Sequence, residues 1–66
     1  MTAQEMFEKL GFNLSSAGTI DTIIYKQHDS HIRFWRDDRV YDTFGFDITV
    51  ETHQAITQQM KELGWL

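Results

Sequence analysis

The sequence predicts a two-layer α+β domain in which a three-stranded antiparallel sheet carries both helices on one face. Segments with apolar residues at helical spacing stand at the two ends of the chain, and runs rich in β-branched and aromatic residues lie between them. Short connections between these runs favour an antiparallel meander. A small sheet needs a cover on one face, and two amphipathic helices provide it. The 66 residues are expected to form one domain, residues 1–66.

The first helix is indicated by signals at both of its ends. Thr2 followed three residues later by Glu5 predicts a capping box at its start. Gly11 stands where a left-handed C-cap is expected, so that Phe12 folds back onto Phe7 in a Schellman motif. The apolar stripe between these signals consists of Ala3, Met6, Phe7 and Leu10.

The last helix has the same kind of punctuation. Thr49 is the expected N-cap, and Glu51 is favourable near the positive end of the helix. Gly64 is expected to end the helix and to let Trp65 fold back onto Met60. The predicted apolar stripe consists of His53, Ile56, Met60 and Leu63, and the predicted solvated polar face of Gln54, Gln58 and Gln59.

Three strands are predicted between the helices. Residues 13–19 (NLSSAGT) read as a loop by composition. The β-rich runs that follow are TIDTIIYKQ at 19–27, HIRFWR at 31–36 and VYDTFGFDI at 40–48.

Side chains alternate along strands, so residue parity predicts which of them share a face. The even-numbered set is almost wholly apolar and is expected under the helices: Ile20, Ile24, Ile32, Phe34, Val40, Phe44 and Phe46. The odd-numbered set is amphipathic and is expected on the uncovered face: Ile23, Tyr25, His31, Arg33, Trp35, Tyr41 and Thr43.

Keeping the even set together requires loops with an odd number of residues. Three-residue loops at 28–30 and 37–39 meet this requirement. The alternative is a pair of two-residue loops at 29–30 and 37–38. It would put Phe44 and Phe46 on the face opposite Ile32 and Phe34, and it would set Arg36 against Arg39, a like-charge pair. Neither loop has the glycine that such turns prefer.

The three-residue loops would gather four side chains on the uncovered face, namely Tyr25, Arg33, Trp35 and Tyr41. In this register Tyr25 lies opposite Arg33, and Trp35 lies between Ile23 and Tyr41. Tyr, Trp and Arg are enriched at protein-interaction hot spots, so we expect this predicted cluster to bind a protein partner or a second copy in a weak homodimer. A purely structural role, with the rings covered by the C-terminal tail or the 12–18 loop, remains open.

Composition and charge limit the other classes of function. The net charge of −4 makes nucleic acid an unlikely partner. Single-stranded nucleic acid stacking on the predicted cluster is kept as an alternative. The chain has no cysteine for thiolate chemistry. No stretch has the length of a transmembrane helix, and no signal peptide is recognisable, so we expect a cytoplasmic protein without a membrane partner.

The histidines give only weak signals. His28 and His31, with Asp29, have a spacing that suggests a metal site, but a site needs three or four ligands in a defined geometry. A metal-dependent function through this loop is therefore kept only as an alternative, and no cofactor is expected. His53 is expected to be partly buried between helix and sheet. No spacing places a catalytic pair and no glycine-rich phosphate loop is present, so we expect a protein that is not an enzyme.

Two segments carry a resemblance to a known class of proteins. TAQEMFEKLGF at the start and ETHQAITQQMKELGW at the end are similar to the opening and closing helices of short proteins from Gram-positive bacteria and their prophages. The resemblance covers about 26 of the 66 residues and implies a bacterial or prophage accessory protein. That class has no assigned activity, and the resemblance carries over no site residue.

Overall fold

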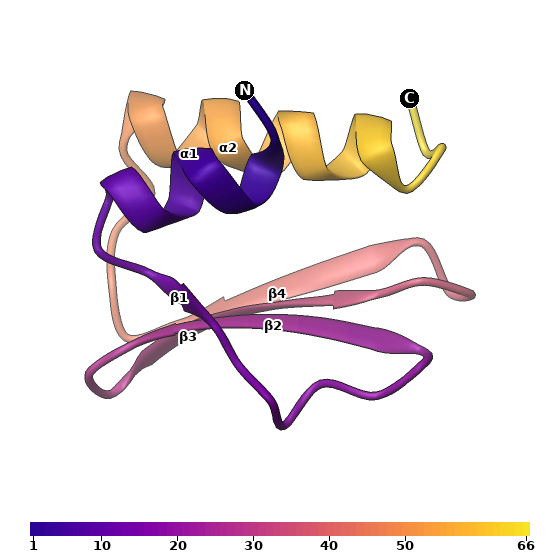
Figure 1. Ribbon diagram of the computed structural model, residues 1–66, viewed down its shortest axis with the longest axis horizontal. Coiled ribbons are helices and arrows are strands. Elements are labelled where there is room, and N and C mark those ends of the chain that lie inside the picture. The colour runs from indigo at the N-terminus through magenta and orange to yellow at the C-terminus, as the bar shows by residue number, and fades with distance from the viewer.

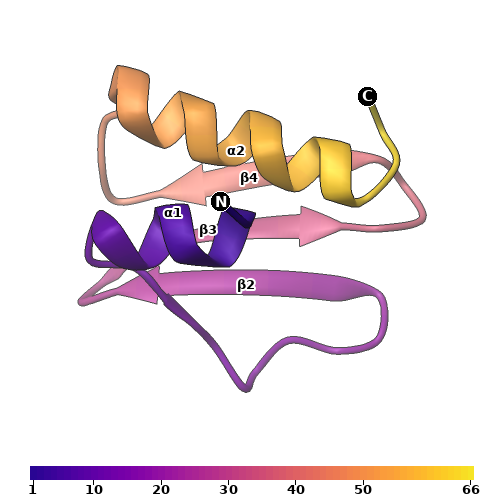
Figure 2. The same cartoon turned by 45° about the horizontal axis from the view of Figure 1, so that its top comes forward.

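Two helices pack on one face of a four-stranded antiparallel sheet in the computed structural model, which describes all 66 residues (Figure 1). The elements are α1 (Ala3–Lys9), β1 (Asn13–Leu14), β2 (Thr22–Gln27), β3 (Ser30–Trp35), β4 (Val40–Phe44) and α2 (Val50–Glu62). The strands lie in the sheet in chain order, and each pairs antiparallel with the next. Figure 2 shows both helices on the same side of this sheet. The α+β class, the meander and the placement of both helices are confirmed.

The fourth strand, β1, lies where the sequence predicts a loop. Asn13 pairs with Lys26 and Leu14 with Tyr25, and the Ser15 N–H extends the ladder by donating to the Ile24 carbonyl at 2.7 Å. A strand of two residues is too short to show an alternating pattern. β1 forms because the segment after α1 runs beside the outer edge of β2, whose main-chain N–H and C=O groups are free to bond with it.

The predicted signals at the ends of α1 are confirmed. Thr2 and Glu5 form a reciprocal capping box. At the other end Gly11 has φ 93°, and the Phe12 N–H donates to the Phe7 carbonyl at 3.0 Å. The two phenyl rings then meet edge to face at 6.0 Å, so the cap directs a core side chain as well as ending the helix.

The ends of α2 also match the sequence, and three of the four predicted stripe residues lie in or against the core, namely Ile56, Met60 and Leu63. Thr49 caps the helix, and after Gly64 (φ 78°) the Trp65 N–H donates to the Met60 carbonyl. The buried residues of α2 are Thr52, Ala55, Ile56 and Gln59. His53 is exposed, so its predicted partial burial is wrong. Gln59 is buried and accepts a hydrogen bond from Tyr25, so its predicted place on the solvated polar face is wrong; Thr52 is likewise buried and bonded to Thr49.

The hairpin between β2 and β3 has a different register from the one predicted. Tyr25 lies opposite Ile32, and the pairing of Gln27 with Ser30 leaves a two-residue loop of His28 and Asp29. His28 adopts φ 51°, the left-handed conformation that such a tight turn demands. The predicted three-residue loop, and with it the pairing of Tyr25 with Arg33, is wrong.

The hairpin between β3 and β4 also has an even loop. Trp35 pairs with Val40, which leaves four residues, Arg36–Arg39, in the connection. Arg39 has φ 57° and its N–H donates to the Trp35 carbonyl at 3.0 Å. Both hairpin loops thus have an even number of residues. As a result, the odd-numbered residues of β2 and β4 and the even-numbered residues of β3 face the helices.

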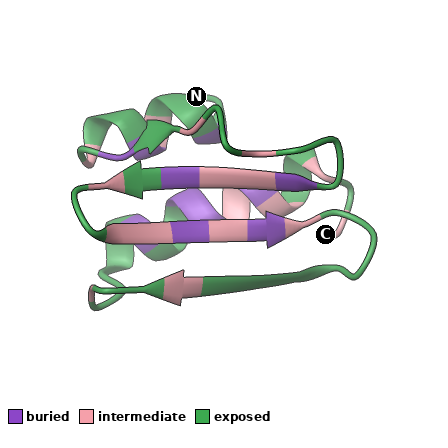
Figure 3. Cartoon of the chain, turned by 90° about the horizontal axis from the view of Figure 1, so that it is seen from below, coloured by how far each residue is buried: buried purple, intermediate pink, exposed green.

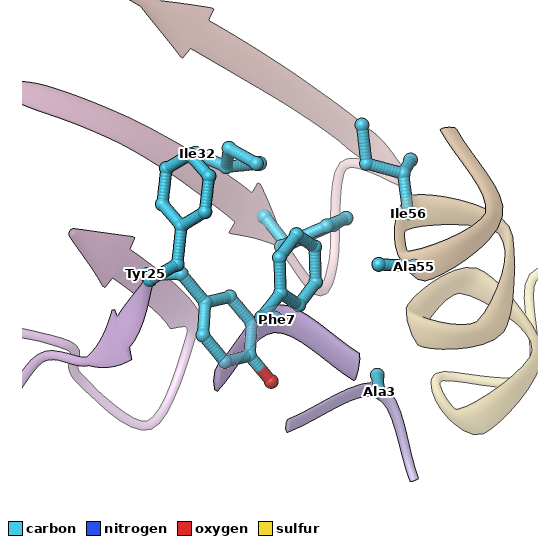
Figure 4. Close-up of a cluster of buried hydrophobic side chains, with 8 residues drawn as sticks. Ala3, Phe7, Tyr25, Ile32, Ala55 and Ile56 are labelled. Atoms are coloured by element: carbon cyan, nitrogen blue, oxygen red, sulfur yellow. The ribbon is translucent and has the colours of Figure 1, made fainter. Parts of the chain in front are cut away.

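The helix-facing side of the sheet, here called the covered face, therefore consists of Ile23, Tyr25, Ile32, Phe34, Tyr41 and Thr43. Phe7 of α1 lies at the centre of the core, stacked on Tyr25 with ring centroids 4.2 Å apart (Figure 4). It also meets Phe34 edge to face at 6.3 Å. Ile32 and Phe34 are fully buried, as the sequence predicts.

Four other members of the predicted core lie outside it. Ile24 belongs to the opposite face, while Ile20, Val40 and Phe44 are 88%, 50% and 61% exposed. Phe46 is the exception among the residues after β3. Gly45 has φ 85° and reverses the alternation, so that the Phe46 ring lies 5.1 Å from Phe12.

Candidate functional site: the open face of the sheet

The side of the sheet that bears no helix, here called the open face, is the candidate site. Figure 3 shows it in front of the two helices. Its side chains are Thr22, Ile24, Lys26, His31, Arg33, Trp35, Val40, Asp42 and Phe44. The face combines aromatic, aliphatic and charged groups from three strands.

Arg33 connects two neighbours at the centre of this face. Its guanidinium carbon lies 4.6 Å from the centroid of the Trp35 ring, two residues along the same strand. Its Nη2 donates to Asp42 Oδ2 at 2.9 Å on β4. The two side chains of this ion pair are 35% and 47% exposed, so the pair orders the surface but contributes little to folding stability.

Apolar groups surround this charged centre on the β4 side. The His31 and Phe44 rings stack with centroids 5.5 Å apart and planes inclined by 15°. Phe44 is nevertheless 61% exposed, and Val40 at the other end of β4 is 50% exposed. Contact with water at these two positions is unfavourable, and a partner that covered them would remove that cost.

The hollows of the surface are shallow. The one on the open face measures about 210 Å³ and is lined by Ala17, Ile24, Lys26, His31 and Arg33. Pockets for small organic ligands start at about 300 Å³ and enclose most of the ligand. The largest hollow, about 750 Å³, lies beside β1 and has a single apolar lining residue, Leu14. The open face itself therefore suits a flat macromolecular contact better than an enclosed small molecule.

Only two members of the predicted cluster belong to the open face. Arg33 and Trp35 lie there in direct contact. Tyr25 and Tyr41 lie on the covered face, where Tyr25 is 3% exposed and the Tyr41 ring lies 5.6 Å from Phe34. The gathering of the four side chains on one surface is therefore wrong, because both hairpin loops have an even number of residues.

The open face also holds side chains that the sequence pattern places in the core or leaves without a role. Ile24, Val40 and Phe44 are expected under the helices from their parity, and no role is predicted for Asp42. A signal for their true position is present in the sequence, since even loops are the alternative that moves Phe44 away from the other apolar side chains. The sequence disfavours that alternative because it leaves large apolar groups in water.

Tyr25 has a structural role instead of a binding one. Its hydroxyl donates to Gln59 Oε1 at 2.6 Å inside the fold. Burial raises the pKa of Tyr25 to about 12, and the negative charges of Glu62 and Glu8 add to that shift. The phenol is therefore held neutral as a hydrogen-bond donor, and the amide of Gln59 satisfies it.

The histidines do not converge with other ligands. No group of three His, Asp or Glu side chains is placed to hold a metal ion. His28 is an exposed turn residue, and the ring of His31 is stacked on Phe44. The arrangement offers no observation in favour of a metal-dependent function through this loop. Neither helix is long and apolar enough to cross a membrane.

No protein-family model matches the chain, and searches of curated proteins and of solved structures gave no match. The similarity of the two helical segments to short proteins of Gram-positive bacteria and prophages thus stays a prediction.

Proposed function

We propose that the chain is a non-enzymatic binding module that contacts another protein through the open face. The supporting observation is the exposure of Val40 and Phe44 beside the Arg33–Trp35 contact. Large apolar groups that remain in water next to ordered Arg and Trp side chains are typical of interaction hot spots.

The order within this face favours tight contact. Trp35 is held by the Arg33 guanidinium, and that guanidinium is held in turn by Asp42. Side chains fixed before binding lose less conformational entropy when a partner covers them.

Protein is favoured over single-stranded nucleic acid by the same contacts. A base needs a free aromatic ring on which to stack, and phosphates need uncompensated cations. The Trp35 ring already carries the guanidinium, whose charge is compensated by Asp42. The net charge of −4 adds a general repulsion of phosphate.

The proposal is tested by using the chain to capture proteins from a Gram-positive host, with two variants at the open face and a control variant at an exposed apolar residue elsewhere. Phe44→Ser and Trp35→Ala remove apolar groups from the open face. Val50→Ser does the same at the start of α2, where Val50 is 70% exposed on the other layer. We expect the first two variants to lose captured proteins that Val50→Ser retains. Equal capture by all three would contradict a role for the open face.

Binding of short single-stranded oligonucleotides at low salt is the second arm of this experiment. Binding that weakens steeply with salt would replace the protein-binding proposal with the nucleic-acid alternative. A bacterial or prophage accessory role in the cytoplasm fits the proposal and guides the choice of host, and it rests on the sequence alone.

A further inference from the structure

The two edges of the sheet are finished in different ways. At the β1 edge the strand has only two residues, and the chain then follows β2 closely. The Ser15 N–H donates to the Ile24 carbonyl. The chain also passes close to β2 at Gly18, where an added Cβ would lie only 3.0 Å from the Thr22 carbonyl oxygen. At the other edge β4 has five residues, and Figure 3 shows no element beyond it. Unpaired main-chain groups therefore remain at β4.

The direction of these groups follows from the ladder. In an antiparallel strand both main-chain groups of a residue point to one neighbour, and successive residues point to opposite neighbours. The Arg36 N–H donates to the Asp21 carbonyl at 2.9 Å, so even-numbered residues of β3 bond to β2 and odd-numbered ones to β4. With Arg33 opposite Asp42, the residues of β4 that point outward are Tyr41 and Thr43.

This edge lacks the devices that usually keep edge strands apart. Natural edges carry lysine, proline, a bulge or a covering segment. The chain contains no proline, and β4 has the sequence VYDTF with no lysine. Its one charge, on Asp42, is compensated by Arg33 within the same sheet. The flanking Val40 and Phe44 are half or more exposed.

We propose that the β4 edge pairs antiparallel with the β4 edge of a second copy of this chain, about a two-fold axis through Asp42. Tyr41 of each copy would then face Thr43 of the other, and the four outward N–H groups, two from each copy, would all find carbonyl partners. On the open face, Val40 of each copy would pack against Phe44 of the other.

This register is selected by the strand itself. Side chains of paired residues must share a face, so the axis has to pass through a residue. An axis at Tyr41 would place Thr43 opposite Arg39, a loop residue with φ 57°. An axis at Thr43 would place Tyr41 opposite Gly45, where φ is 85° and the strand has ended. Only the axis at Asp42 pairs strand with strand along the whole edge.

A second copy is favoured over an unrelated peptide because the edge is complementary to itself. The apolar residues Val40 and Phe44 are each two residues from Asp42, on opposite sides of it. The two-fold axis through Asp42 therefore brings Val40 of each copy opposite Phe44 of the other. The dimer would join two four-stranded sheets into one of eight strands with both open faces on the same side. It goes beyond the proposed function because it pairs main-chain groups at an edge; it would cover Val40 and Phe44, which that function also uses, and leave Trp35 free.

The contact is small and carries one repulsion. A stable interface takes about 800 Å² from each partner, and a contact limited to five edge residues is smaller, so association is expected to be weak and to appear only at high protein concentration. The two Asp42 carboxylates would stand directly opposite each other, which disfavours pairing. Each keeps its own Arg33, giving a row of four charges across the junction, with the two carboxylates in the middle.

The test is sedimentation of the full chain from about 10 μM to about 1 mM. Two variants are compared with it, one expected to weaken association and one expected to strengthen it. Thr43→Pro removes the outward N–H without touching the ladder to β3 and should abolish association. Asp42→Asn removes the facing charges and should tighten it by roughly threefold. Amide exchange at Tyr41 and Thr43 should slow with concentration, while other exposed amides keep their rates.

The variants also separate this inference from the proposed function. A dimer that survives Thr43→Pro but is lost in Trp35→Ala would associate through the open face, and the edge pairing would be wrong. A wild-type chain and an Asp42→Asn variant that both stay monomeric at about 1 mM would also overturn it. Far-UV circular dichroism of Thr43→Pro checks that the fold is kept. If that variant unfolds, the change in dimer affinity of Asp42→Asn tests the edge pairing in its place.

Discussion

The two faces of the sheet are made from similar side chains but hold them in different ways. The covered face joins its rings into one network, in which Phe7 contacts Phe12, Tyr25 and Phe34. The open face holds separate pairs, one between Arg33 and Trp35 and one between His31 and Phe44.

The difference lies in what stands above each face. Helices supply both apolar contacts and polar partners, so the covered face accepts a tyrosine whose hydroxyl is bonded by Gln59. The open face has only its own neighbours, and its aromatic groups stay partly in water. Apolarity alone therefore does not decide which side of a strand is buried, because a buried polar atom needs only a partner.

The largest expected effect separates two neighbours on β3. Phe34→Ala removes a fully buried ring and should lower the free energy of unfolding by about 3–5 kcal/mol, enough to unfold a chain of this size. Trp35→Ala, one residue along and on the open face, should cost about 1 kcal/mol. Urea denaturation measures the loss in each variant that still folds, and far-UV circular dichroism shows whether Phe34→Ala does. Equal losses would mean that the open face is buried in solution by an interface.

The second prediction concerns Tyr25 and alkaline pH. Its folded pKa of about 12 lies above the ordinary value near 10, so the neutral phenol stabilises the fold. This contribution is complete below pH 10 and is lost as pH rises toward 12. The free energy of unfolding should fall by no more than about 2 kcal/mol over that range beyond the fall seen in Tyr25→Phe.

Tyr25→Phe serves as the control and carries its own expectation. At neutral pH it should cost about 1 kcal/mol, because the Gln59 amide oxygen loses its buried donor. If the wild-type chain and Tyr25→Phe lose stability in parallel above pH 10, the hydroxyl is not held neutral by the covered face.

The smallest effect is expected at the turn that sets which residues reach each face. His28 has φ 51°, a conformation that glycine adopts without the steric cost of a Cβ. His28→Gly should raise the free energy of unfolding by about 0.5 kcal/mol. Asp29→Gly is the matched control, since Asp29 does not have a positive φ and glycine there should destabilise. Thermal unfolding distinguishes the two, and the reverse order would contradict the two-residue loop.

Local chemistry made the helix ends predictable from the sequence. Thr2 with Glu5, Thr49, Gly11 and Gly64 each act on main-chain groups a few residues away, and each is found as expected. The order of helix, strands and helix and the burial of Ile32 and Phe34 follow from patterns of the same short range.

The candidate site was predictable only in part. Arg33 and Trp35 alternate with two strongly apolar neighbours, so the two faces of their strand are clear from the sequence. The strands on either side carry apolar groups at both parities, and their orientation depended on loop lengths. Those loops contain no glycine, although His28 and Arg39 both adopt a positive φ.

By itself the sequence determined where the helices begin and end, the antiparallel meander, and the two faces of β3. Only the tertiary structure decided that Tyr25 is buried under the helices, that the 37% exposed Tyr41 faces the same side, and that Val40 and Phe44 face the other. The reason is physical. The loop residues accept a left-handed conformation at a small local cost, and the distant Phe7 and Gln59 more than offset that cost by enclosing Tyr25. Contacts between residues 18 or 34 positions apart are invisible to a local pattern.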